Sequence, residues 1–206
     1  MPAPLLAALA GLGLGLSLII AIGAQNAYVL RQGLRREHVF AVVAICALSD
    51  LVLIALGVGG AGIVFDAIPW LVPAVRIAGA AFLLVYAILA ARRAIRPQAT
   101  LTASQTPAPT RVAVVVTTAL ALTWLNPHVY IDTVVLLGSI ASTHGANRWW
   151  FGAGAGIASI AWFTALGVGA RLLAPVFARP IAWRILDGLI AVVMLAIAIS
   201  LAAGAF

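Results

Sequence analysis

Two aspartates stand within long apolar runs of this sequence, where a charged side chain is costly. Asp50 lies near the middle of the apolar run 39–65, and Asp132 lies in the run 112–140. If these runs cross a lipid bilayer, a carboxylate at mid-depth costs ~2.5–3.5 kcal/mol on insertion scales and must face protein, water or an opposite charge. Such carboxylates are typical of ion and substrate paths. The pair therefore predicts a site that holds a cation, a proton or each in turn.

The run that contains Asp132 is interrupted by a proline. Pro127 has no N–H, so the carbonyl of Thr123 loses its helical hydrogen-bond partner. Asn126 followed by Pro127 is also typical of an N-cap and first helical residue. We therefore expect two half-helices that meet near the bilayer centre, where non-helical backbone is tolerated only if it is buried in protein or lines a cavity.

Gln25 and Asn26 interrupt the first apolar run, 5–30, in a similar way. They mark either a second break or an ordinary cytosolic helix end close to Arg31. Tyr130, which follows the second break, either supplies a hydroxyl to a ligand or fills an interface. Besides the two aspartates, the predicted substrate-binding residues are Gln25, Asn26, Asn126, Pro127 and Tyr130.

A helix that is broken at mid-membrane offers charges to a solute. The second half-helix directs its positive N-terminal end inward, which suits a carboxylate, and the freed carbonyls of the first half suit an ammonium group. The two aspartates add acceptors for a second positive charge. An amino acid with a cationic side chain satisfies all of these groups, and this is the substrate class that we predict.

Two further residues have alternative interpretations. Arg76 is either the structural counter-ion of an aspartate, Asp50 being one candidate, or a competitor that the substrate displaces. His128 and Asp132 are four residues apart, a spacing compatible with a metal, but no third ligand accompanies them. We predict no metal site and no cofactor.

The composition sets the fold class. Of 206 residues, 65% are hydrophobic and only 8% are charged, against roughly a quarter charged in ordinary soluble domains. A soluble protein is therefore excluded, and we expect an all-α polytopic membrane protein, since ~20 apolar residues suffice for one span. The six expected transmembrane helices cover 5–30, 39–65, 70–91, 112–140, 149–173 and 185–206.

The arginines predict the orientation. All 12 basic residues are arginine, and ten of them lie in or beside the first, third and fifth connections. By the positive-inside rule these connections are cytosolic, so a multi-pass protein of the cell membrane with both termini outside is expected. No basic stretch has interleaved aromatics, so nucleic-acid binding is not expected. Arg184 and Asp187, at the start of the last run, are expected to form a local pair.

The only long polar stretch, 92–111, divides the chain into nearly equal halves. It is too polar to build a core and is predicted as a flexible cytosolic linker. Residues 1–91 and 112–206 would each hold three spans that run in opposite directions. The sequence therefore predicts two inverted three-helix repeats with broken helices near the bilayer centre, as in many secondary transporters.

Three stretches carry a resemblance to a known family: Gly23-Ala-Gln-Asn-Ala-Tyr-Val-Leu-Arg-Gln-Gly33, Cys46-Ala-Leu-Ser-Asp-Leu51 and Leu125-Asn-Pro-His-Val-Tyr-Ile-Asp-Thr133. They are similar to the LysE/ArgO family of basic amino-acid exporters, and the resemblance covers nearly the whole chain apart from the linker. It implies export of L-lysine and L-arginine from the bacterial cytosol, with Asp50 and Asp132 as the two essential intramembrane aspartates. Related exporters of neutral amino acids share the general fold plan, so the side chain of the substrate is less firmly implied.

The function expected from the sequence is secondary transport. Moving a cation out of a negative-inside cell costs ~2.3 kcal/mol per 100 mV, and the chain has no Walker motif to couple ATP. We therefore expect proton-coupled antiport by alternating access, with membrane lipid and protons as further partners and either a monomer or a homodimer as the unit. The alternatives are export of neutral amino acids or of an inorganic cation, an intramembrane enzyme, and a scaffold without transport.

Overall fold

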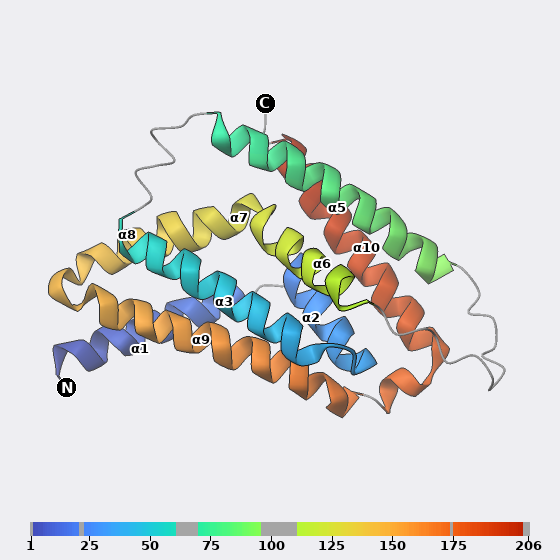
Figure 1. Ribbon diagram of the computed structural model, residues 1–206, viewed down its shortest axis with the longest axis horizontal. Coiled ribbons are helices and arrows are strands. Elements are labelled where there is room, and N and C mark those ends of the chain that lie inside the picture. Colours follow the sequence, from blue (N-terminus) through green and yellow to red (C-terminus); the bar gives the residue numbers. More distant parts are fainter. Residues whose placement is uncertain (1, 21–22, 61–69, 96–110, 174, 204–206) are drawn as a thin grey trace.

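The computed structural model describes residues 2–20, 23–60, 70–95, 111–173 and 175–203, and nearly all of these residues are helical (Figure 1). No strand occurs within these ranges. The longer helices are α1 (Ala3–Ile19), α2 (Ala24–Arg35), α3 (Val39–Val58), α5 (Leu71–Ile95), α6 (Val112–Trp124), α9 (Arg148–Gly169) and α10 (Pro180–Ala203). Between α6 and α9 lie α7 (Pro127–Val129), the π-helix η1 (Tyr130–Leu136), α8 (Leu137–Thr143) and the 3₁₀ turn η2 (Gly145–Asn147), and η3 (Ala170–Leu173) and η4 (Val176–Ala178) precede α10.

These helices suit a multi-pass membrane protein. Four of them are long and apolar enough to cross a bilayer, within Val39–Val58, Arg76–Ile95, Gly145–Leu173 and Pro180–Ala203. The number rises to six if each of two bent helix pairs counts as one span. The expected all-helical membrane class is confirmed, and the six expected spans correspond to the upper number.

Both bent pairs fall in the runs where breaks were expected. The segments Val112–Trp124 and Pro127–Thr143 meet at 57°, and α1 and α2 meet at 82°. In the first run the alternative of an ordinary helix end at Gln25 and Asn26 is wrong, because α2 begins before these residues and continues to Arg35. The break precedes them, and Gly23 is the extended N-cap of α2.

Several helix boundaries differ from the sequence-based expectation. Helix α5 continues to Ile95, so the first four residues of the predicted linker are helical, whereas 96–110 lie outside the described residues. The extension has partners on α10, because Arg184 Nε donates to the Ala94 carbonyl at 2.9 Å. Helix α10 itself begins at Pro180 rather than at 185, and proline is well suited to a first helical turn. Helix α3 ends at Val58, and 61–65 of its predicted span lie outside the described residues.

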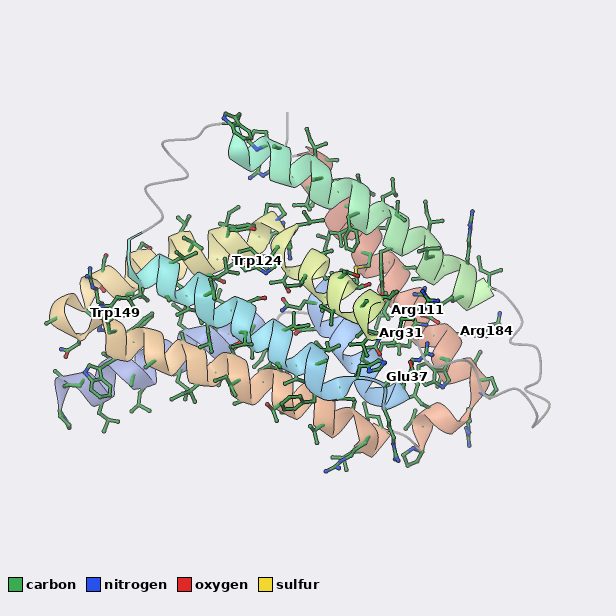
Figure 2. The ribbon with its side chains drawn as sticks, viewed as in Figure 1. Arg31, Glu37, Arg111, Trp124, Trp149 and Arg184 are labelled. Atoms are coloured by element: carbon green, nitrogen blue, oxygen red, sulfur yellow. The ribbon has the colours of Figure 1, made fainter. Side chains whose placement is uncertain are left out.

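The arginine-rich ends of the helices gather at one end of the bundle. Figure 2 shows Arg31, Arg111 and Arg184 at this end and Trp149 at the opposite one. Here the buried Asp187 of α10 accepts hydrogen bonds from Arg31 Nη1 of α2 at 2.7 Å and from Arg93 Nε of α5 at 3.2 Å. The expected local pair of Arg184 and Asp187 is therefore wrong. Asp187 instead joins three helices that are distant in sequence.

Glycines allow four pairs of segments to approach closely. A Cβ atom at Gly11 of α1 would collide with the Phe151 carbonyl of α9, and one at Gly154 of α9 would collide with the Ala8 carbonyl of α1. We call such a close contact at glycine a seam, and there are three more of them among the described residues. Gly57 and Gly138 lie between α3 and α8, and Gly33 and Gly167 lie between α2 and α9. Gly79 of α5 lies against the Leu125 carbonyl at the break after α6. Small residues at helix interfaces are the usual means of close packing in membranes.

The seam between α1 and α9 leads to a matched prediction. Replacing Gly11 by alanine forces the two backbones apart, and overpacking of this kind typically costs ~1–3 kcal/mol. Gly13, on the same helix, has nothing within 4 Å of an added Cβ atom. We expect the thermal unfolding temperature of the Gly11→Ala variant in detergent to fall by several degrees, and that of the Gly13→Ala variant to remain at the wild-type value. Equal temperatures for the two variants would contradict the close approach of α1 and α9.

Candidate functional site

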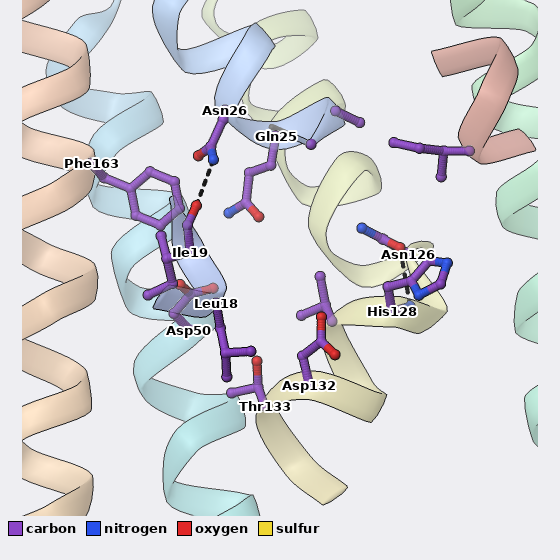
Figure 3. Close-up of a pocket in the computed structure, with 14 residues that line it drawn as sticks. Leu18, Ile19, Gln25, Asn26, Asp50, Asn126, His128, Asp132, Thr133 and Phe163 are labelled. Carbon is purple, nitrogen blue, oxygen red and sulfur yellow. Dashed lines mark hydrogen bonds between the residues drawn. The ribbon is translucent and has the colours of Figure 1, made fainter. Parts of the chain in front are cut away.

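Both helix breaks border one cavity of about 260 Å³. The end of α1, the start of α2, the middle of α3 and the segment from Asn126 to Thr133 form most of its wall (Figure 3). Its lining residues are Leu18, Ile19, Gly23, Ala24, Gln25, Asn26, Asp50, Asn126, His128, Val129, Asp132, Thr133, Phe163 and Ile197. Residues from both halves of the sequence therefore meet in one cavity.

The two aspartates found from the sequence both line this cavity. Asp50 of α3 is 6% exposed, and its Oδ2 accepts a hydrogen bond from Ser159 Oγ of α9 at 2.8 Å. Asp132 lies on the π-helix η1 and is partly buried. In Figure 3 the two carboxylates face the cavity from different walls. Carboxylates brought together in this way attract cations and protons.

Gln25 is a hydrogen-bond donor without a strong acceptor. It lines the cavity, where Figure 3 shows its amide directed inward, and its Nε2 atom is buried with no hydrogen-bond partner of good geometry among the described residues, the weakly accepting Cys46 thiol being a neighbour. A buried unsatisfied donor costs roughly 1–3 kcal/mol, more when it is deprived of a charged partner. An anionic group in the cavity would relieve this cost.

The asparagines at the two breaks, Asn26 and Asn126, form hydrogen bonds with nearby backbone groups. Asn26 Nδ2 donates to the Ile19 carbonyl at 2.6 Å, and Trp162 Nε1 of α9 donates to Asn26 Oδ1 at 3.2 Å. Asn26 thereby joins the end of α1 to α9. Asn126 is the N-cap expected from the sequence, since its Oδ1 accepts the His128 N–H at 3.1 Å.

The second break follows the chemistry of proline. Pro127 occupies the first helical position of α7 and is buried. The Thr123 carbonyl, deprived of the N–H that residue 127 would supply, accepts the Asn126 N–H at 3.3 Å in a tightened turn. Tyr130 OH donates to the Trp124 carbonyl at 2.7 Å and so bridges the break.

Three of the predicted site residues are placed elsewhere. Pro127, Tyr130 and Arg76 are not among the described residues that line the cavity, whereas Gln25, Asn26 and Asn126 are. Arg76 lies on α5, whereas Asp50 accepts a hydrogen bond from Ser159 of α9. The hydroxyl and indole of α9, Ser159 and Trp162, were not predicted. A single serine or tryptophan within an apolar run gives no signal of its contacts.

The segment that carries Asp132 is a π-helix. It spans Tyr130–Leu136, and the Leu137 N–H closes a wide turn on the Asp132 carbonyl. π-Helical turns are rare and are frequently found at functional sites. The wall that carries Asp132 therefore departs from α-helical geometry twice, at Leu125 and Asn126 and again from Tyr130 to Leu136, with the short α7 between.

Comparison with known proteins gives consistent relatives. The LysE type translocator family matches residues 16–204. A Mycobacterium tuberculosis protein provisionally named an amino-acid transporter is 50% identical over 184 residues, covering 89% of this chain and 90% of the relative. The lysine exporter LysE of Corynebacterium efficiens is 37% identical, with 93% and 96% covered, and the arginine exporter protein ArgO of Serratia proteamaculans is 43% identical, with 94% and 95% covered. No solved structure matches the chain.

Proposed function

Since this chain belongs to the LysE type translocator family, we propose that it exports cationic amino acids, L-arginine, L-lysine or both, from the bacterial cytosol. Relatives named lysine exporter and arginine exporter support amino-acid export, and the proteins of this family are transporters rather than enzymes. The finer assignment, to cationic substrates and to proton coupling, depends on the cavity.

The observation that carries the proposal is the composition of the cavity wall. Asp50 and Asp132 offer two anionic acceptors, and Gln25 offers a buried donor that has no strong acceptor among the residues that the structure describes. A cationic amino acid has two positive groups and one carboxylate, so it complements this set. A neutral amino acid would leave one aspartate without a cation, and buried uncompensated charge is costly.

Proton coupling follows from the energetics of export. Each cation that leaves against the membrane potential costs ~2.3 kcal/mol per 100 mV, and proton entry can offset that cost. A buried carboxylate can hold either a proton or a cation, so the same two aspartates can serve both ions in turn. Exchange of one proton for one cation is electrically neutral.

The packing of the helices supports inverted repeats and alternating access. The broken span formed by α1 and α2 packs on α9, and the broken span formed by α6, η1 and α8 packs on α3, which is the same relationship with the halves exchanged. The remaining long helices, α5 and α10, pack against each other. A twofold exchange of 1–91 and 112–206 reproduces this pattern, as expected of inverted repeats. The arginine-rich end would face the cytosol and the termini the outside.

Counterflow in liposomes tests the function. The purified protein is reconstituted with unlabelled arginine inside, and uptake of external radiolabelled arginine is followed with and without a pH gradient. We expect accumulation that lysine and arginine inhibit and threonine does not, and a rate that changes with the gradient. Inhibition by threonine would favour a neutral amino-acid exporter, and indifference to the gradient would contradict proton coupling. Absence of accumulation in protein-containing liposomes would leave the scaffold alternative.

Gln25 supplies a prediction about the substrate carboxylate. In the Gln25→Leu variant the donor is lost, and hydrogen bonds to charged groups contribute ~1.5–3 kcal/mol, or about 10- to 150-fold in affinity. We expect the inhibition constant of arginine to rise by at least tenfold, whereas that of agmatine, which lacks the carboxylate, stays the same. Gln32→Leu, on the same helix but outside the lining of the cavity, is the matched control. An equal loss for both ligands would exclude a carboxylate contact.

A further inference from the structure

Ser159 differs from seven other described helical hydroxyls in what it binds. Seven serines and threonines donate to a carbonyl three or four residues earlier in their own helix: Ser17, Thr117, Thr118, Thr123, Ser139, Ser142 and Thr143. That local bond is the default for a hydroxyl within a helix. Ser159 instead donates across to Asp50 Oδ2 on α3, although the same local bond is open to any helical serine.

Both residues of this contact are buried, and Asp50 also lines the partly open cavity. The Ser159 side chain is 0% exposed, and Asp50 is 6% exposed. A hydroxyl has one proton, so Ser159 can donate one hydrogen bond, and that bond goes to Asp50 Oδ2. Oδ1 is the Asp50 oxygen that remains for an ion in the cavity. Ser159 itself is fully buried, and a hydrogen bond in surroundings of low dielectric constant is stronger than the same bond in water.

The hydrogen bond from Ser159 favours one protonation state of Asp50 over the other. A hydroxyl that donates to a carboxylate stabilises the ionised form of the acid, whereas burial favours the protonated form. In an exporter of the proposed kind, the ionised form binds the cationic substrate and the protonated form returns the proton. The Ser159 hydroxyl therefore acts on the balance between the two ligands without contacting either one.

We propose that Ser159 is a positioning residue that holds the Asp50 carboxylate ready for a cation and so sets the pH range in which the transporter binds its substrate. This inference rests on the proposed function. The other titratable groups near Asp50 are Asp132 and His128, which share the cavity from η1 and α7, and Cys46, which lies one turn earlier on α3. Ser159 is the group that α9 contributes by hydrogen bond.

The test measures arginine binding by the purified protein across pH 5 to 9. For Ser159→Ala we expect the pH of half-maximal binding to move upward by at least half a unit, so that affinity falls about twofold or more at the wild-type midpoint, about threefold or more well below it, and recovers at high pH. Ser159→Thr retains the hydroxyl and should restore the wild-type profile. Ser139→Ala, which removes a hydroxyl bonded within its own helix, is the control.

Each outcome decides the inference. A Ser159→Ala profile that keeps the wild-type midpoint, or that loses affinity equally at every pH, overturns it. If the alanine variant does not insert, Ser159→Cys, which keeps a weak donor of similar size, should show a smaller shift in the same direction, and no shift overturns the inference. Failure of the wild-type protein to bind arginine at all would reject the proposed function instead.

Discussion

Export by the Asp50→Asn variant is expected to fall below about 1% of the wild-type rate. Asparagine has nearly the same shape, but it cannot pair with a cation or release a proton at physiological pH. Truncating one partner of a buried, hydrogen-bonded charge pair costs ~2–5 kcal/mol, which corresponds to about 30- to several-thousand-fold in binding. Arginine counterflow in liposomes measures the loss, because it requires both binding and movement of the loaded cavity.

The same variant should insert and fold normally. Removing a charge from mid-membrane lowers the cost of insertion, and the amide oxygen of asparagine can still accept the Ser159 hydroxyl. Glu37→Gln is a matched control, because Glu37 pairs with Arg35 at 3.1 Å and does not line the cavity. A normal export rate in Asp50→Asn would refute the role of this carboxylate. Loss of protein from the membrane would show that Asp50 is needed for assembly.

The second large effect is expected at Asp132 and concerns the charge of the substrate side chain. Asp132 lies on η1, on a different wall of the cavity from Gln25 and Asp50 (Figure 3). If Gln25 and Asp50 bind the α-carboxylate and α-ammonium groups, Asp132 binds the side-chain cation. For Asp132→Asn we expect arginine affinity to fall by about 100-fold, the amount that ~2.7 kcal/mol represents. Citrulline, which has a neutral side chain of nearly the same shape, should be affected less than threefold.

Competition by arginine and citrulline in the counterflow assay measures this change. His128→Gln is the matched control, because it alters another polar side chain of the same wall without removing a carboxylate. Equal losses for arginine and citrulline would place Asp132 at the α-ammonium group instead. Unchanged affinity for both would remove Asp132 from the substrate site.

The break at Pro127 could be predicted because its cause is local. A missing N–H acts within one helical turn, and the structure shows the expected N-cap at Asn126. Asp50 and Asp132 could be selected because charge in an apolar run is costly wherever the run packs. That they line one cavity depends on the assembly of four segments, and sequence spacing cannot supply this.

The errors have a common physical origin in long-range packing. Asp187 was expected to pair with Arg184 on its own helix, yet Arg31 and Arg93 reach it from α2 and α5. The extension of α5 to Ile95 and the role of Ser159 likewise depend on a neighbouring helix. Local propensity is a weak guide where a tertiary contact offers a stronger partner.

The glycine seams predict which amino-acid substitutions the protein tolerates. At Gly11, Gly79 and Gly154 even one added methyl group meets a carbonyl of a neighbouring segment, so a saturation mutagenesis survey should find them nearly as intolerant as Asp50. The reasons would differ, and so would the readouts. Seam variants should reduce cellular abundance, whereas cavity variants should accumulate to ordinary levels and leave the cells sensitive to arginine-containing peptides. Scoring cellular abundance and survival together would separate the residues needed for folding from those needed for transport.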